Sequence, residues 1–425
     1  MESLPVELVT HITTYMDLPS ISSLRLTSRT LASKLWHENL PHFFAYKNVK
    51  LDQASLQDLV YMTSRGRAGC LLRHCTITNI ADTDSLVLTR LLTNAFINLK
   101  HNSPRGGLVS LCLTVDSLPE LHDEIDEQSD SDDSIILPPK SRRSQYVIWR
   151  KSQQIFKSTM LALRDSQLPI SEHFDTLGAV RRYSLPYHSV LFSNEHSQSP
   201  ISSLSSLKKL TMSLSSTCLS SPMIEPNVII NTLSDESLHG TRVLRGLLAM
   251  LASLPQLEDL EIHWYNVCAR DAAGPEHHMK SLDVTSPPYS AHLKTCTLRG
   301  LYVTGEALLE FLKAVQPKLL TMTDISLVSG VWTPIFEYLS SPNSPIASYH
   351  LDDLEENGLK LVHFEDVPGR SKFRYLSDIL GPSTLIRQAC EARATIRYRL
   401  PTRRALGSGE YRRWWQSKVL EFGPP

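Results

Sequence analysis

The stretch Leu4-Pro5-Val6-Glu7-Leu8, near the beginning of the chain, opens a series of apolar residues at helical spacing. The series continues at steps of three or four residues, which place side chains on one face of an α-helix. Pro5 suits the first turn of such a helix, because a backbone N–H there has no partner within the helix. The sequence therefore predicts an amphipathic helix with an apolar stripe formed by Leu4, Leu8, Ile12, Tyr15 and Met16.

Two further helices are predicted before residue 40. Asp17-Leu18-Pro19 ends the first helix and starts the second, since the residue before a proline avoids the α region and an aspartate accepts hydrogen bonds from free N–H groups. Ser28 is a candidate N-cap for a third helix that ends near Trp36. A unit of about 45 residues is close to the lower size limit for a self-sufficient core. Some of its apolar side chains are therefore expected to be covered by something else.

Residues 1–46 resemble the F-box, the adaptor-binding module of Skp–cullin–F-box ubiquitin ligases. The resemblance rests on four motifs in order: Leu-Pro-x-Glu-Leu at 4–8, Asp-Leu-Pro at 17–19, Leu-Arg-Leu-Thr-Ser-Arg at 24–29 and Leu-Trp at 35–36. It covers about a tenth of the chain. The resemblance implies that the adaptor is bound by Leu4, Pro5, Glu7, Leu8, Ile12, Met16, Leu18, Pro19, Leu24, Leu26, Ser28, Leu35 and Trp36.

The same segment has two other interpretations. One is a helical cap on the domain that follows, and the other is a three-helix DNA-binding unit. Through residue 46 there are three cations, Arg25, Arg29 and Lys34, and four acids, Glu2, Glu7, Asp17 and Glu38. The segment therefore lacks the basic surface that phosphate binding requires, and we expect no nucleic-acid partner.

Composition indicates an ordinary globular protein. The chain has 425 residues, 41% of them hydrophobic and 20% charged, which gives room for two or three domains. The 43 basic and 44 acidic side chains nearly balance, and this argues against a general polyanion binder. Because Met1 leads almost directly into the helical segment and no long apolar run follows, we expect no membrane partner and a cytoplasmic or nuclear protein. The seven scattered cysteines are expected to be reduced.

After a predicted linker helix at 47–66, residues 67–386 carry a weak repeat of the form apolar-x-x-apolar-x-apolar. Its last three units start 26 and 27 residues apart, within the range of leucine-rich repeats, where each unit supplies a strand and a helical return. Leucines at helical spacing lie between units at 83–99, 241–254 and 305–315. Chance triplets within an irregular α/β domain are the alternative. The triplets are Leu72/Cys75/Ile77, Leu108/Leu111/Leu113, Val180/Tyr183/Leu185, Leu207/Leu210/Met212, Leu257/Leu260/Ile262, Leu293/Cys296/Leu298, Leu319/Met322/Asp324 and Ile346/Tyr349/Leu351.

The predicted fold class is therefore α+β, with a three-helix F-box followed by an irregular α/β solenoid similar to leucine-rich repeats. Longer gaps between units, including 119–170, are read as insertions. Residues 116–143 are predicted to be a disordered acidic insertion, because nine acidic residues lie between Asp116 and Asp133.

The basic and aromatic segment 387–425 is predicted to be either a cap or a binding tail. Residues 387–418 hold eight arginines, with few nearby acids, and Trp414 and Trp415 among them. A repeat array needs a polar cap over its open end, whereas the planar fork of arginine suits an acidic partner. The candidate target-binding residues are Arg397, Arg399, Arg403 and Arg404.

No catalytic motif is visible, so we expect a non-catalytic protein without a cofactor or metal. The sequence has no Gly-x-Ser-x-Gly elbow, no phosphate-binding loop and no His-Glu-x-x-His pair. The resemblance, which extends to divergent F-box proteins of filamentous fungi, implies a substrate-recognition subunit for ubiquitin-dependent degradation. Its expected partners are the Skp adaptor, cullin through the adaptor, and an unknown protein target. A non-degradative, adaptor-bound scaffold and an enzyme of unrecognised fold are the alternatives.

Overall fold

The computed structural model describes residues 2–13, 15–16, 18–37, 44–64, 68–79, 85–116, 139–178, 183–186, 189, 202–218, 244, 246–248, 250–268, 292–356, 360–373, 375, 379–402 and 414. None of the helices in these ranges is long and apolar enough to cross a membrane.

Three short helices at the N-terminus form a unit with its own core. They are α1 (Val6–Thr13), α2 (Leu18–Thr27) and α3 (Arg29–His37). Ser28 caps α3, because its Oγ accepts hydrogen bonds from the backbone N–H groups of Thr30 at 3.2 Å and Leu31 at 3.4 Å. The buried cluster inside this unit is separate from the main core of the molecule. It consists of Val9, Ile21, Leu31 and Leu35, with Leu4, Met16, Leu24 and Phe44 packed against it.

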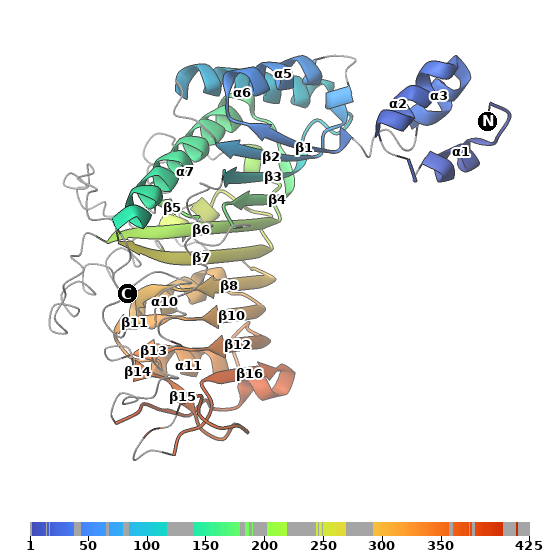
Figure 1. The fold of residues 1–425 in the computed structure, drawn as a ribbon. Coiled ribbons are helices and arrows are strands. Elements are labelled where there is room, and N and C mark those ends of the chain that lie inside the picture. Colours follow the sequence, from blue (N-terminus) through green and yellow to red (C-terminus); the bar gives the residue numbers. More distant parts are fainter. Residues whose placement is uncertain are drawn as a thin grey trace, which may run out of the picture.

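A large, mostly parallel sheet organises the rest of the chain into a mixed α/β fold (Figure 1). Each strand pairs with the strands that precede and follow it along this path, and only the last pair is antiparallel. The strands in spatial order are β1 (Tyr46–Lys50), β2 (His74–Asn79), β3 (Leu108–Val115), β4 (Ile170–Thr176), β6 (Lys209–Cys218), β7 (Asp259–Cys268), β8 (Thr295–Arg299), β10 (Leu319–Thr323), β12 (Ser348–Asp352) and β16 (Thr384–Gln388). Off this path, β5 (Leu185–Pro186) pairs with β6.

A sharp corner follows several of these strands. Residues just past β8, β10 and β12 have positive φ, at 72° for Gly300, 56° for Asp324 and 49° for Asp353. Glycine and aspartate adopt this conformation most readily. After each corner the chain enters a second small sheet, formed by β9 (Tyr302–Thr304), β11 (Ser326–Ser329), β13 (Glu355–Glu356) and β14 (Lys360–Leu361).

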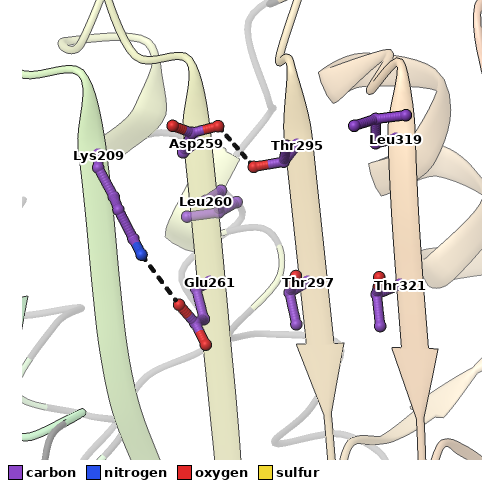
Figure 2. Close-up of a pocket in the computed structure, with 8 residues that line it drawn as sticks. All are labelled: Lys209, Asp259, Leu260, Glu261, Thr295, Thr297, Leu319 and Thr321. Atoms are coloured by element: carbon purple, nitrogen blue, oxygen red, sulfur yellow. Dashed lines mark hydrogen bonds and ion pairs between the residues drawn. The ribbon is translucent and has the colours of Figure 1, made fainter.

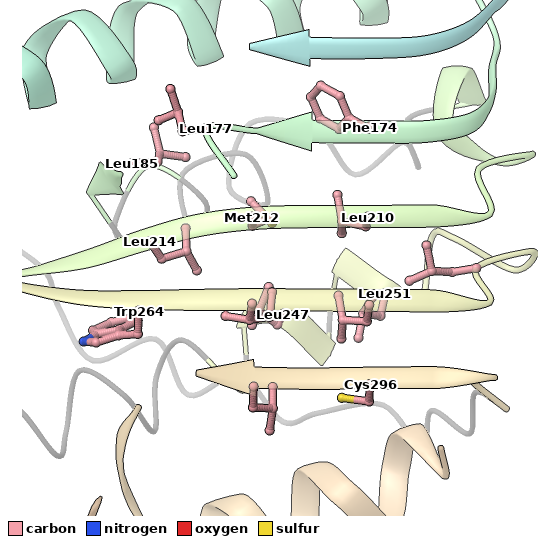
Figure 3. Close-up of a cluster of buried hydrophobic side chains, with 14 of the residues drawn as sticks. Phe174, Leu177, Leu185, Leu210, Met212, Leu214, Leu247, Leu251, Trp264 and Cys296 are labelled. Carbon is pink, nitrogen blue, oxygen red and sulfur yellow. The ribbon is translucent and has the colours of Figure 1, made fainter. Parts of the chain in front are cut away.

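Helices return the chain between strands and bury their apolar faces in the main core. Leu308 and Leu312 of one such helix are fully buried, as are Leu92 and Phe96 of another. Figure 3 shows the middle of this core, where Leu210 and Met212 lie next to Phe174 of the preceding strand. The helices are α5 (Gln53–Thr63), α6 (Ser85–Asn102), α7 (Pro139–Ser166), α10 (Gly305–Val315) and α11 (Thr333–Ser340), with short 3-10 segments η1 (Ala68–Leu71), η3 (Ser202–Leu204) and η5 (Ala389–Arg393).

The register corrects one of the predicted triplets, and the sheet contains a strand that none of them predicted. Leu319 was assigned to the core, but it is 48% exposed, whereas Leu320 is buried and pairs with Cys296. The buried residues here are Pro317, Leu320 and Met322, each two residues earlier than predicted, and Asp324 forms the corner instead of filling an apolar position. The strand after β3 is β4, at 170–176, which none of the predicted triplets contains, whereas Leu185 of the triplet that starts at residue 180 lies in β5.

The sheet also extends beyond its predicted limits. It begins at Tyr46, so the predicted linker 47–66 contains both β1 and α5, and Leu56 and Leu59 of α5 belong to the main core. Residues 139–143 of the predicted acidic insertion are the first residues of α7. Residues 117–138 lie outside the described part of the chain.

Candidate binding surface

One side of the sheet presents polar side chains between β6 and β16. In β8, Cys296 and Leu298 are buried on the core side, while Thr295, Thr297 and Arg299 on the other side are half-exposed. The same alternation recurs in β10 and β12 because side chains of a strand point to opposite faces. We call the second side the open face. It is formed by Lys209, Asp259, Glu261, Thr295, Thr297, Leu319, Thr321, Ser348, His350, Ile386 and Gln388.

Two adjoining hollows lie on the open face. The first, of about 400 Å³, extends from Lys209 on β6 to Thr321 on β10 (Figure 2). The second, of about 370 Å³, extends from β10 to Gln388 on β16. Both hollows are lined by Leu319 and Thr321, so together they form one shallow surface across five neighbouring strands, β6 to β12, and the closing strand β16.

The charges of the first hollow are unequally compensated. Glu261 accepts a hydrogen bond from His263 at 3.0 Å and lies 3.4 Å from the ammonium of Lys209. The hydrogen bond from His263 and the charge of Lys209 lower the pKa of Glu261 to about 2. Asp259 instead accepts a hydrogen bond from the hydroxyl of Thr295 at 2.6 Å. Within the described part of the chain, no cationic side chain makes an ion pair with Asp259.

Several hydrogen-bonding groups on this surface remain available. The hydroxyls of Thr297, Thr321 and Ser348 make no side-chain hydrogen bond to another described residue. Leu319 and Ile386, at 48% and 58% exposure, supply apolar contacts beside these polar groups. The surface can therefore bind a ligand that combines hydrogen-bonding backbone with apolar side chains.

A cysteine, a histidine and an aspartate meet further along the sheet, but they do not form an activated nucleophile. The thiol of Cys112 donates to Asp175 at 3.8 Å, and His173 contacts Thr211 at 3.1 Å. Burial, together with the charge of Asp175, raises the pKa of the Cys112 thiol to about 12. A thiol that stays protonated is a poor nucleophile. Among the described residues, no group of His, Cys, Asp and Glu side chains is arranged to hold a metal ion.

The structure divides the predicted adaptor-binding residues into two groups. Leu8, Ile12 and Leu26 are exposed by 50%, 39% and 89%, and Tyr15 beside them by 79%. Pro5 and Glu7 are also exposed, whereas Leu4, Met16 and Leu24 pack against the helical core, Leu35 lies within that core and Ser28 caps α3. The side chains of Leu18, Pro19 and Trp36 lie outside the described part of the chain.

Two of the four predicted target-binding arginines are paired with acids. Arg397 lies 3.6 Å from Asp366, and Arg399 forms an ion pair with Glu365. These contacts join β17 (Tyr398–Arg399) to the segment that follows its antiparallel partner β15 (His363–Phe364). The expectation that few acids lie near these arginines is therefore wrong for Arg397 and Arg399. Arg403 and Arg404 lie outside the described residues.

Other residues of the same C-terminal segment fasten it to the end of the sheet. Arg393 donates to the backbone carbonyls of Ser341 at 3.1 Å and Ser344 at 2.8 Å. The indole N–H of Trp414 donates to Asp353 at 3.1 Å. The described part of the segment is thus joined by hydrogen bonds to residues next to α11 and β12.

Comparisons of the chain with protein-family models, with curated proteins and with solved structures found no match. The sequence motifs did not identify Asp259, Leu319 or Ile386 as surface residues. The signal that could have identified them is the alternation within each strand, because residues next to the inward apolar positions point outward. For Leu319 that signal was hidden by the incorrect triplet.

Proposed function

We propose that this protein is the substrate-recognition subunit of a Skp–cullin–F-box ubiquitin ligase. Helices α1 to α3 dock on the Skp adaptor, and the open face holds a protein target. We further propose that residues 46–402 form a degenerate array similar to leucine-rich repeats. The sequential order of the parallel strands and the recurrent positive-φ corner after them support this part of the proposal.

The observation that carries the proposal is the exposed apolar surface of a helical unit that has its own core. Leu8, Ile12 and Leu26 occupy positions of the F-box motif and remain exposed although their neighbour Val9 is fully buried. Leu8 and Ile12 lie one turn apart on α1, and neighbouring exposed apolar side chains on a small unit mark an interaction site. The adaptor is the partner that the motif implies.

In this function the protein contributes proximity and performs no bond chemistry. The adaptor and cullin bring a ubiquitin-conjugating enzyme near the target that is held on the sheet. Tethering raises the effective concentration of target lysines at that enzyme.

The test is the affinity of the purified full-length chain for a recombinant Skp adaptor, measured by calorimetry. Burial of one leucine or isoleucine contributes roughly 1.5 to 3 kcal/mol, so the double variant Leu8→Ala, Ile12→Ala should bind at least about tenfold more weakly. Tyr61→Ala is the matched control, because Tyr61 is an exposed apolar residue on α5. Unchanged affinity of a folded double variant refutes the assignment. Cullin in the purified complex separates a ligase subunit from an adaptor-bound scaffold.

A further inference from the structure

The open face combines a carboxylate, free hydroxyls and exposed aliphatic side chains in a fixed order. Cross-strand pairing places Asp259, Thr295 and Leu319 in one row, on β7, β8 and β10. A parallel row on β12 and β16 contains the pair His350 and Ile386. Because strand pairing fixes these positions, the arrangement of charged, polar and apolar side chains on the open face does not depend on the conformations of loops.

The charge on this surface favours a cation as the ligand group of the first hollow. Lys209 is engaged by Glu261, and Arg299 lies outside the residues that line the hollow. Among the described residues that line the first hollow, the carboxylate of Asp259 is therefore the charged group that has no oppositely charged partner. A lysine or arginine side chain would pair with this carboxylate, which accepts a hydrogen bond from Thr295 but has no cationic partner among the described residues.

The second hollow requires an apolar group. Leu319 and Ile386 lie on either side of β12, and each exposes about half of its surface. An aliphatic side chain placed between them would remove apolar area from water, which contributes roughly 25 cal/mol per Å². The hydroxyls of Thr321 and Ser348 border this position and can bond a peptide backbone.

The separation between the two hollows sets the spacing of the ligand groups. Neighbouring strands lie about 4.8 Å apart, so Asp259 on β7 lies about 14 Å from β12, over which the aliphatic group would lie. An extended chain advances about 3.3 Å per residue, so a cation and an aliphatic side chain would be roughly four residues apart. The flexible stem of lysine or arginine tolerates one residue more or less.

We infer that the open face binds an extended peptide segment in which a lysine or arginine precedes or follows an aliphatic residue at this spacing. The cation pairs with Asp259, the aliphatic side chain lies between Leu319 and Ile386, and the hydroxyls of Thr321 and Ser348 bond the peptide backbone. The inference rests on the proposed function in one respect, because it assumes that the peptide segment belongs to the ubiquitination target.

The experiment selects peptides from a phage-displayed library of random short peptides on the immobilised full-length chain. Enriched peptides are synthesised with a fluorescent label, and their affinities are measured by fluorescence anisotropy. We expect enrichment of peptides with lysine or arginine near leucine, isoleucine or valine. Asp259→Asn and Leu319→Ser should each weaken their binding by at least about tenfold.

Two matched variants control for general effects of charge and exposure. Glu258→Gln removes the neighbouring acid, which pairs with Lys294 outside the hollow. Ile379→Ser removes an aliphatic side chain that is fully exposed and does not line either hollow. Both controls should bind the selected peptides as the unchanged protein does, and melting temperatures should show that all four variants remain folded.

Several outcomes overturn the inference. These are the absence of any enriched peptide, enrichment of acidic peptides, and binding that survives both Asp259→Asn and Leu319→Ser. Self-association that is lost in Leu319→Ser would assign the face to a second copy of the chain instead. Adaptor affinity, measured on the same variants, should not change. If the unchanged protein did not bind the adaptor, the ligase proposal would be rejected, but the peptide result would still stand.

Discussion

At the scale of single residues, Asp353 shows how one buried carboxylate joins distant parts of the chain. It is 4% exposed and accepts hydrogen bonds from Lys372 at 2.8 Å, Ser383 at 2.9 Å and Trp414 at 3.1 Å. The ammonium of Lys372 also lies 5.6 Å from the centre of the Trp414 ring. A charge buried in this way stabilises a structure only while its partners remain in place.

We predict that Asp353→Asn lowers the free energy of unfolding by about 2 kcal/mol, since it removes the charge of a buried carboxylate that accepts a hydrogen bond from the half-exposed ammonium of Lys372. Asparagine tolerates the positive φ of 49° at this corner, so the substitution tests the charge and not the backbone. Thermal and urea denaturation measure the effect. Asp366→Asn is the control: both members of its pair with Arg397 are exposed, and the change should stay below about 1 kcal/mol. Equal effects would contradict the role given to Asp353.

The buried thiols give a second prediction at this scale. Burial raises the pKa values of Cys75 and Cys296 to about 12, while Cys390 is exposed. Brief treatment of the native protein with iodoacetamide at about pH 8 should therefore modify Cys390 and spare the other two, because only the thiolate reacts. Peptide mapping by mass spectrometry locates the label. Rapid labelling of Cys296 in the folded protein would show that its surroundings are open to water.

The same shifts predict the direction of alkaline destabilisation. The native thiols hold their protons up to a pKa of about 12, whereas an ordinary thiol loses its proton near 9.0. Between these values the unfolded chain binds fewer protons than the native protein, so the free energy of unfolding falls as pH rises. Cys296→Ala should reduce the slope of stability against pH above about 9. A slope equal to that of the unchanged protein would contradict this account.

At the scale of secondary structure elements, the helices were the more predictable part. The segments 83–99 and 305–315 of the sequence correspond to α6 and α10, because leucine spacing alone identifies a helix that packs on a core. Strand β4 was missed because its buried residues Ile170, Phe174 and Thr176 include a threonine and are spaced by a register shift against β3, so they do not follow the predicted triplet. The open face could not be derived in this way, since it depends on which strands become neighbours in space.

The corrected position of β10 can be tested directly. Leu320 is buried and Leu319 is exposed, so the pair offers the same side chain in adjacent positions on opposite faces. We predict that Leu320→Ala lowers the free energy of unfolding by about 2 to 5 kcal/mol. Leu319→Ala should change it by less than about 0.5 kcal/mol. The triplet expected from the sequence would require the reverse order, and urea denaturation of the two variants distinguishes them.

At the scale of the whole molecule, the two separate cores predict two modules. Ala45 belongs with the sheet, because its carbonyl accepts hydrogen bonds from the backbone N–H groups of Arg73 at 2.9 Å and His74 at 2.8 Å. A chain that starts at Ala45 should therefore keep a cooperative unfolding transition close to that of the full-length protein. It should bind no Skp adaptor. Circular dichroism and calorimetry check the two statements, and a truncated chain that cannot fold would show that the modules depend on each other.

The antiparallel closing strand β16 has a consequence for how the chain is made. During synthesis the N-terminal part leaves the ribosome first, and every parallel strand after β1 finds its neighbour already translated. Strand β16 is the last strand of this sheet to be translated, and it pairs with the edge of β12. Without β16, the unpaired backbone groups of β12 could form hydrogen bonds with a strand of another molecule. A ribosome that stops before residue 384 thus releases a sheet in which the edge strand at this end is β12 instead of β16. A nonsense mutation late in the gene would therefore act through aggregation, although it removes few of the residues that bind a target.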